Sequence, residues 1–170
     1  NLGIPRISVL ELGVAGGNGL VEMERLSIEV SLATGVDVQP IGFDLGSGMP
    51  APQDYRDLPY IWQKGFFSMD EKLLRNRLTS ARLIVGDVAE TLTEFLDAAN
   101  APIGFISFDV DYYTSTSAAL SALGSSDVKM FVPRVFCYFD DTVGPHEELH
   151  SRFAGELLAI VEIKFHGAAL

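Results

Sequence analysis

Short apolar runs alternate along the chain with segments whose apolar residues recur every three to four positions. The runs have the length and composition of buried strands, and the recurring positions indicate amphipathic helices between them, as at Met23, Leu26, Val30 and Ala33. Five strands are expected, at residues 7–13, 38–44, 81–87, 103–109 and 134–141. Strands that alternate with helices predict an α/β fold, namely a doubly wound, mostly parallel sheet with helices on both faces.

One connection is longer than the others. Residues 46–80, between the second and third expected strands, are rich in Pro, Tyr and Phe. A connection of this length is often a lid over a substrate, and it can equally be a surface insertion with its own small helix. Residues 1–170, including this segment, are expected to form a single domain with one core. Residues 146–160 are expected to be helical.

The composition narrows the classes of partner. Apolar residues make up 48% of the chain, charged residues 21%, and the net charge is −11. This charge argues against binding to nucleic acid and to anionic membrane surfaces, because proteins bind both of these mainly through Lys and Arg. The single cysteine, Cys137, excludes an intrachain disulfide and a CxxC metal site, and no apolar run reaches the roughly 18 residues of a transmembrane helix. We expect a cytoplasmic protein whose partner is a small-molecule substrate. The sequence does not decide whether the protein forms a homo-oligomer.

The chemistry is expected at the carboxyl ends of the strands, because ligands of open α/β sheets bind there, where the strand order reverses. The first strand runs into the glycine-rich turn ELGVAGGNG at residues 11–19, whose backbone and following helix can approach a ligand closely. Asp44 ends the second strand, where a carboxylate can accept ribose hydroxyls or form a turn. Asp87 follows the third and, with Glu90, also has the spacing of a helix capping box.

Two acidic pairs follow the last two strands: Asp109 with Asp111, and Asp140 with Asp141. If these strands are neighbours, the carboxylates converge, and their repulsion raises their pKa values unless a cation lies among them. Oxygen ligands of this kind suit Mg²⁺. Each aspartate by itself could be a helix cap or a turn residue, but together they favour a metal site.

Five short motifs follow the strands in order: Glu-x-Gly-Val with two glycines, Asp-x-x-x-Gly-Met-Pro, Gly-x-x-x-x-Thr-Leu, Asp-x-Asp-x-Tyr-x-Ser-Thr and Asp-Asp. They comprise Glu11, Gly13, Val14, Gly16, Gly17, Asp44, Gly48, Met49, Pro50, Gly86, Thr91, Leu92, Asp109, Asp111, Tyr113, Ser115, Thr116, Asp140 and Asp141. In these motifs residues 7–145 resemble class I S-adenosylmethionine-dependent methyltransferases, and more narrowly the metal-dependent macrocin O-methyltransferase family. The chain departs from that family at Val88, where an aromatic residue is usual, and at Pro133-Arg134, where Pro-Gly-Gly is usual.

The resemblance implies a Rossmann-like fold whose last strands are truncated or lie outside this sequence. It implies an enzyme of natural product biosynthesis that methylates a hydroxyl of a sugar or another small metabolite, with S-adenosylmethionine and Mg²⁺ or another divalent cation. The residues from Glu11 to Asn18, with Gly13 and Gly17, would wrap the methionine part. Asp44 would hold the ribose, and Gly86, Asp87 and Val88 would line the adenine pocket. Asp109, Asp140 and Asp141 would bind the metal. Asp111 is the first candidate for the base, and His146 is the second.

Three alternatives stay open. HEELH at residues 146–150 matches the His-Glu-x-x-His pattern of zinc peptidases, but it lacks the extended pattern with a third histidine, and Gly144 and Pro145 place both histidines at a helix start. Gly13, Gly17 and Gly19 match the turn of short-chain dehydrogenases, but a Tyr60-to-Lys64 pair comes too early in the chain for their catalytic residues. The third alternative is a non-catalytic protein that binds an adenosyl ligand.

Overall fold

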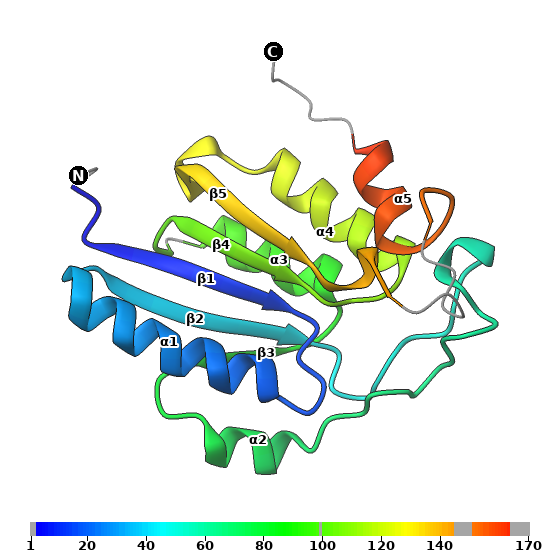
Figure 1. Ribbon diagram of the computed structural model, residues 1–170, viewed down its shortest axis with the longest axis horizontal. Coiled ribbons are helices and arrows are strands. Elements are labelled where there is room, and N and C mark those ends of the chain that lie inside the picture. The colour runs from blue at the N-terminus through cyan, green and yellow to red at the C-terminus, as the bar shows by residue number, and fades with distance from the viewer. Residues whose placement is uncertain (1–2, 99, 145–150, 164–170) are drawn as a thin grey trace.

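The computed structural model describes residues 3–98, 100–144 and 151–163. Within them the chain forms a five-stranded sheet in the order β3-β2-β1-β4-β5, and every neighbouring pair is parallel (Figure 1). The strands are β1 (Arg6–Leu12), β2 (Asp37–Asp44), β3 (Arg82–Val85), β4 (Ile103–Phe108) and β5 (Phe131–Phe139). The predicted α/β fold and the five predicted strands are therefore confirmed, with ends that differ by a few residues.

The centre of the sheet is β1, which pairs with strands from both halves of the chain. Leu12 pairs with Phe43 of β2 on one side and with Phe108 of β4 on the other. The chain builds outward from β1 to β3 and then returns across β1 to start β4, so the strand order reverses between β1 and β4. The carboxyl ends of β1, β2 and β4 lie together at this reversal, where ligands of such sheets bind.

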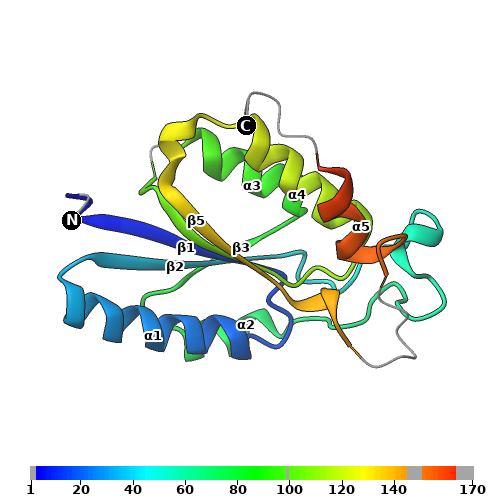
Figure 2. The same cartoon turned by 45° about the horizontal axis from the view of Figure 1, so that its top comes forward.

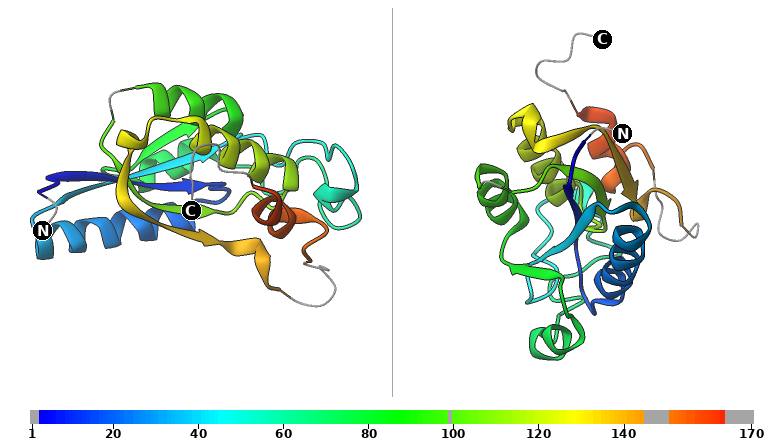
Figure 3. Two further views of the ribbon diagram at one scale, coloured as in Figure 1. Left: turned by 90° about the horizontal axis from the view of Figure 1, so that it is seen from above. Right: turned by 90° about the vertical axis from the view of Figure 1, so that its left-hand side faces the viewer.

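Helices cover both faces of the sheet, as predicted. Helices α1 (Asn18–Thr34) and α2 (Glu71–Arg77) lie on one face, and α3 (Val88–Asp97) and α4 (Tyr113–Ser125) lie on the other (Figures 2 and 3). Helix α5 (Gly155–Glu162) packs against α4. Three short 3₁₀ turns complete the described elements, at Tyr55–Asp57, Val128–Met130 and Asp140–Thr142. None of the described helices is long and apolar enough to cross a membrane.

The main core lies between the central strands and the face covered by α3 and α4. It contains Leu10 and Leu12 of β1, Phe43 of β2 and Phe108 of β4, all fully buried. The ring of Phe43 meets Phe95 of α3 edge to face at 5.5 Å between centroids. Because both faces of these strands are covered, their apolar residues are nearly continuous, which is the pattern that made the strands recognisable.

Two boundaries differ from the prediction. Strand β5 begins at Phe131 rather than at residue 134, and it includes Pro133. Proline lacks the N–H that a central strand needs, but β5 is the last strand of the described sheet and tolerates it. Helix α5 begins at Gly155, and residues 151–154 form turns closed by a bridge between Ser151 and Ala154, so the predicted helix is shorter than 146–160. The HEELH segment lies outside the described residues.

Helix α1 exists where the apolar spacing predicts it, but the apolar stripe is not its buried side. Leu26 and Val30 are 44% and 46% exposed, whereas Glu24 and Ser27 are buried. The carboxylate of Glu24 accepts backbone N–H groups from Thr79 at 2.9 Å and Ala81 at 2.6 Å, and also from Ser80. Burial alone would raise the pKa of Glu24, but these donors outweigh it and lower the pKa. Hydrogen bonds to the segment before β3 therefore orient this helix.

The first prediction concerns this carboxylate. Glu24→Ala leaves three backbone N–H groups without their acceptor, so we expect a loss of unfolding free energy on the order of 3 kcal/mol. Urea denaturation followed by circular dichroism measures it. Glu29→Ala, on the exposed side of the same helix, breaks only a surface ion pair with Arg25 and should change stability by less than about 1 kcal/mol. Equal effects of the two variants would contradict the orienting role of Glu24.

Candidate functional site

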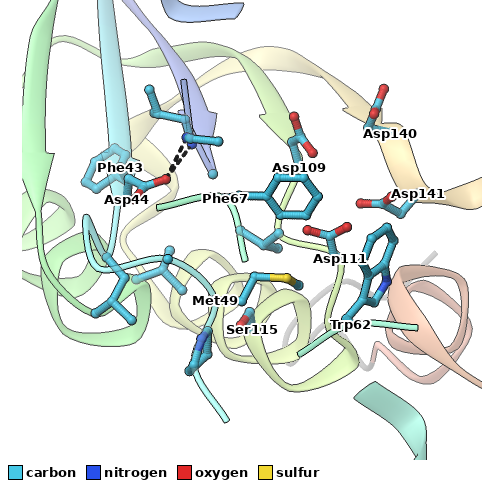
Figure 4. A pocket seen from close by; sticks show the side chains of 18 of the residues that line it. Phe43, Asp44, Met49, Trp62, Phe67, Asp109, Asp111, Ser115, Asp140 and Asp141 are labelled. Atoms are coloured by element: carbon cyan, nitrogen blue, oxygen red, sulfur yellow. Dashed lines mark hydrogen bonds between the residues drawn. The ribbon is translucent and has the colours of Figure 1, made fainter. Parts of the chain in front are cut away.

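A cavity of about 540 Å³ opens at the carboxyl ends of β1, β2 and β4, where the strand order reverses (Figure 4). Its volume is in the range of small-molecule sites. One part is lined by the glycine-rich turn after β1, by Asp44, and by Asp87 and Val88. The other part is lined by the aspartates that follow β4 and β5 and by side chains of the 46–80 segment. The sequence prediction therefore located the cavity at the correct edge of the sheet.

The glycine-rich turn is held close to the end of β4. Gly13 has a φ of +87°, and a Cβ on it would lie 1.7 Å from the backbone oxygen of Asp109, so no other residue fits there. Ala15 also has a positive φ, of 46°. The turn therefore brings the backbone of Val14 and Ala15 to the edge of the cavity, and it packs directly on the residue that begins the acidic pair.

Asp44 joins the turn after β1 to the turn after β2. Its Oδ2 accepts the N–H groups of Val14 and Ala15, both at 2.8 Å (Figure 4). Its Oδ1 accepts the N–H of Gly46 at 2.6 Å. A carboxylate can accept about four hydrogen bonds, so one position is left for a ligand. This structural role is compatible with the predicted ribose contact, which stays a prediction.

Asp87 caps helix α3, as its spacing predicted. Its Oδ1 accepts the N–H of Ala89 at 2.8 Å. Asp87 and the next residue, Val88, both line the cavity, so the capping position and a cavity position coincide. The helix therefore begins at the cavity wall.

Four of the predicted cofactor residues lie outside the cavity lining: Glu11, Gly17, Asn18 and Gly86. Glu11 is only 6% exposed, and its Oε2 has no hydrogen-bond partner among the described residues. The side-chain oxygen of Asn18 accepts a hydrogen bond from Arg77 of α2, which also donates to the backbone oxygen of Gly16. Arg77 and Asn18 therefore support the glycine-rich turn from outside the cavity.

An acidic cluster forms at the ends of β4 and β5. Carboxylate oxygens of Asp109, Asp111 and Asp141 lie within 4.8 Å of one another. Asp140 lines the same cavity, but its Oδ1 accepts a hydrogen bond from Tyr138 at 2.6 Å. The described cluster thus contains Asp111, which was predicted as the base, and not Asp140, which was predicted as a metal ligand. Asp111 adopts a φ of +56°, a strained value for a residue with a side chain.

Repulsion and burial shift the pKa values of these acids. Burial raises the pKa of Asp109 to about 7, with further contributions from Asp141, Asp140 and Asp44. Glu156 of α5 is fully buried behind the cluster, and burial, followed by the charge of Asp141, raises its pKa to about 8. A cation among these oxygens would offset their repulsion and lower the pKa values of the acids.

Glu156 also connects the two acidic loops, a role that the sequence analysis missed. Its Oε2 accepts the N–H of Asp141 at 3.1 Å, and the carboxylate also accepts the N–H of Val110. Its other oxygen has no partner among the described residues. The available signal was a glutamate inside the short apolar helix GELLAIVE, since a buried carboxylate in such a helix needs a specific partner.

Aromatic residues of the 46–80 segment form a further part of the wall, which the sequence analysis also did not name. Trp62, Phe67 and Met49 line the cavity together with the acidic cluster (Figure 4). The sequence did not predict their position, because the apolar residues of this segment do not recur at a regular spacing. His146, the second predicted base, lies outside the described residues.

No protein-family model matches the chain, and no curated protein matches it. Among solved structures the chain is similar to CalS11, a calicheamicin methyltransferase, with 22% identity and a TM-score of 0.71 over 95% of this chain and 65% of that chain. An apo structure of CalS11, described as a TDP-rhamnose 3'-O-methyltransferase of calicheamicin biosynthesis, matches with 23% identity and a TM-score of 0.59 over 95% and 64%. The O-methyltransferase NovP matches with 20% identity and a TM-score of 0.53 over 68% and 50%.

The chain spans about two thirds or less of the length of these structures. At these identities the similarity establishes the fold. The chain therefore has the Rossmann-like α/β fold seen in these O-methyltransferases, as predicted from its strand-end motifs.

The second prediction concerns the pH dependence of stability. Burial first, and then the charges of Asp109 and Asp44, raise the pKa of Glu11 from 4.5 to about 8. In the folded protein Glu11 stays neutral between these values, whereas in the unfolded chain it ionises. The stability that it contributes is therefore complete below about pH 4.5 and is lost as the pH rises through 8.

Glu11→Gln keeps the neutral form at every pH, so the melting temperature of the variant should rise relative to the original protein by several degrees between pH 5 and pH 8.5. Differential scanning calorimetry in EDTA measures it. Glu94→Gln, on the exposed side of α3, controls for the loss of one charge. A constant difference across this pH range would contradict the shifted pKa of Glu11.

Proposed function

We propose that this chain belongs to an S-adenosylmethionine-dependent O-methyltransferase that uses a divalent cation to methylate a hydroxyl of a small metabolite. The observation that carries the proposal is the placement of the acidic cluster in one cavity with the glycine-rich turn, Asp44 and Asp87. Methyl transfer needs the donor and the acceptor side by side, and most of the acceleration comes from holding them in register. The methyltransferases with the same fold support this choice.

The cofactor part of the cavity fits an adenosyl ligand. The glycine-rich turn offers backbone, Asp44 retains one acceptor position for a ribose hydroxyl, and Asp87 with Val88 begins α3 at the wall. Glu11 lies behind the turn and outside the cavity lining, so its contact with the methionine part stays a prediction.

The acidic part fits a hard divalent cation such as Mg²⁺. Asp109, Asp111 and Asp141 supply only carboxylate oxygens, the donors that Mg²⁺ prefers. When bound, the cation would lower the pKa of an acceptor hydroxyl. We retain Asp140 as a ligand candidate, since it lines the same cavity and needs only to release Tyr138.

The chain's own residues would then position the acceptor and remove its proton. With Asp109, Asp140 and Asp141 as the ligands of the cation, Asp111, or His146 as the second candidate, would take the hydroxyl proton. When bound, S-adenosylmethionine would supply the methyl group to the acceptor oxygen and would leave as S-adenosylhomocysteine. Glu156 would keep the loops that carry Asp109 and Asp141 in register through the N–H groups of Val110 and Asp141.

The dehydrogenase alternative gains no support from the site. Tyr60 is 59% exposed, and neither Tyr60 nor Lys64 lines the cavity. The zinc peptidase alternative depends on residues outside the described part of the chain. A non-catalytic adenosyl-binding protein is distinguished by the experiments that follow.

The third prediction concerns the cofactor. S-adenosylhomocysteine should bind the protein, and Asp44→Asn should weaken this binding at least about tenfold, because the variant loses a charged acceptor of the turn and of the ribose. Isothermal titration calorimetry measures both affinities, and Asp97→Asn at the exposed end of α3 serves as the matched control. If NAD binds and S-adenosylhomocysteine does not, the proposed function is wrong.

The fourth prediction concerns the cation. Asp109→Asn and Asp141→Asn should each reduce Mn²⁺ affinity about tenfold or more and should abolish methyl transfer, because each removes a ligand of the acidic cluster. Electron paramagnetic resonance of free Mn²⁺ measures the affinity without relying on turnover. Asp127→Asn, which replaces a cap at a 3₁₀ turn, is the control. Unchanged Mn²⁺ binding in both cluster variants would overturn the metal-assisted mechanism, even if S-adenosylhomocysteine binds.

A further inference from the structure

Asp111 stands in a tight, strained turn between β4 and α4. Its φ is +56°, and the N–H of Tyr112 donates to the backbone oxygen of Val110 across it. A hydrogen bond between residues i and i+2, with a positive φ at the residue between them, marks the rare and strained form of the γ-turn. In this conformation the carboxylate of Asp111 lies beside those of Asp109 and Asp141 (Figure 4). Such a backbone conformation persists only where the surrounding contacts enforce it.

Helix α4 begins directly after this turn and has no cap of its own. Its N-cap residue is Tyr112, whose side chain makes no capping hydrogen bond. Ser, Thr, Asp and Asn are the usual residues at this position, because their side chains accept the N–H groups of the first turn. Here the acceptor comes from the 46–80 segment, since Oδ1 of Asp57 accepts the N–H of Thr114 at 2.9 Å. Asp57 therefore caps α4 from a position 57 residues earlier in the chain.

Further contacts fix Asp57 against the start of the helix. Asp57 is fully buried, and its Oδ2 accepts the hydroxyl of Thr114 at 3.0 Å and the N–H of Gln53 at 2.8 Å. Next to it, the guanidinium carbon of Arg56 lies 4.2 Å from the ring centroid of Tyr113, the first residue of α4. A buried carboxylate whose donors are satisfied in this way makes its surroundings rigid. The cap thus fixes the start of α4 relative to the 46–80 segment.

A second buried carboxylate holds the other side of the turn. Glu156 of α5 is fully buried and accepts the N–H of Val110, the residue before Asp111. Tyr112, the residue after Asp111, is also fully buried, and its hydroxyl donates to the backbone oxygen of Pro50 at 3.2 Å. The residues on both sides of Asp111 are therefore anchored to segments other than β4 and α4.

We propose that Asp57 is a positioning residue for Asp111. By capping α4 from the 46–80 segment, it maintains the strained turn that holds the carboxylate of Asp111 in the acidic cluster, and Glu156 maintains the turn from its other side. The inference rests on the proposed function in one respect, because the cluster is taken to bind a divalent cation. Asp57 belongs neither to the described cavity lining nor to the described cluster, so its effect on the cation passes through Asp111.

A double-mutant cycle on Mn²⁺ affinity tests this coupling. Electron paramagnetic resonance of free Mn²⁺ gives the affinity of the original protein, of Asp57→Asn, of Asp111→Asn and of the double variant. Asp57→Asn should weaken binding about tenfold, because it removes a residue that orients a member of the site. In the Asp111→Asn background the same substitution should change the affinity by less than about twofold, because the two residues act as one unit.

Asp70→Asn is the matched control. Asp70 belongs to the same segment and caps α2, where its side chain accepts the N–H of Leu73 at 2.9 Å. The substitution removes one charge and one helix cap on the other face of the sheet, so it should leave the Mn²⁺ affinity unchanged. Circular dichroism checks that each variant is folded. If Asp57→Asn does not fold, Thr114→Val, which removes only the hydroxyl bonded to Asp57, takes its place.

Two results of the cycle would overturn the positioning role. One is a loss of Mn²⁺ affinity in Asp57→Asn that persists in the Asp111→Asn background, because it would come from the charge of Asp57 or from a general loss of stability. The other is an unchanged affinity in Asp57→Asn when Asp111→Asn weakens binding.

A second measurement does not depend on the cation. The N–H of Tyr112 closes the turn, and its hydrogen exchange can be followed by NMR in EDTA. Asp57→Asn should accelerate this exchange about tenfold or more, whereas Asp70→Asn should leave it unchanged. This measurement decides the positioning role if the protein binds no Mn²⁺ or if Asp111→Asn does not alter the binding, and an unchanged rate then overturns it. An absence of Mn²⁺ binding contradicts the metal-assisted function, while accelerated exchange still supports the role of Asp57.

Discussion

Carboxylates at the ends of parallel strands repel one another, and the candidate site is organised around that repulsion. Asp109, Asp111 and Asp141 share a small volume, with Glu156 buried behind them. Burial and like charge raise the pKa of Asp109 to about 7 and that of Glu156 to about 8. The cluster therefore opposes folding at neutral pH unless a cation or protons neutralise it. A bound divalent cation would attract the same carboxylates, so the arrangement that is unfavourable without the cation would favour its binding.

Other carboxylates serve to join segments that are far apart in the chain. Glu24 holds the segment before β3, Asp44 holds the turn after β1, and Asp57 holds the start of α4. Each of them accepts more than one backbone N–H, so a single side chain satisfies several donors at once. Through Asp44 and Asp57, the two ends of the cavity are attached to the same sheet edge. The positions of the glycine-rich turn and of the 46–80 segment follow from these bonds.

The sequence predicted the elements and the location of the cavity but not the full lining. Buried parallel strands are continuous in apolar residues, so β1, β2 and β4 were readable, and the order of strands and helices implied that their ends meet. The buried face of α1 was not readable, because the partners of Glu24 lie 55 to 57 residues further along the chain. The sequence analysis assigned Asp140 to the metal and Asp111 to the base, whereas the described cluster contains Asp111 and not Asp140. Each of these two residues lies within two positions of another aspartate, so only the direction of the side chain separates them.

The sequence by itself determined which segments become strands and helices, and that acids and glycines stand at the strand ends, because both depend on local periodicity and on turn chemistry. The tertiary structure alone decided that Trp62 and Phe67 face the acids, that Glu156 connects the loops of Val110 and Asp141, and that Asp44 holds the turn after β1. Two of the hydrogen bonds show the separation: Glu156 and Asp141 are 15 positions apart, and Asp44 and Val14 are 30 positions apart. No local pattern encodes such pairs, because they depend on how the sheet brings its strand ends together.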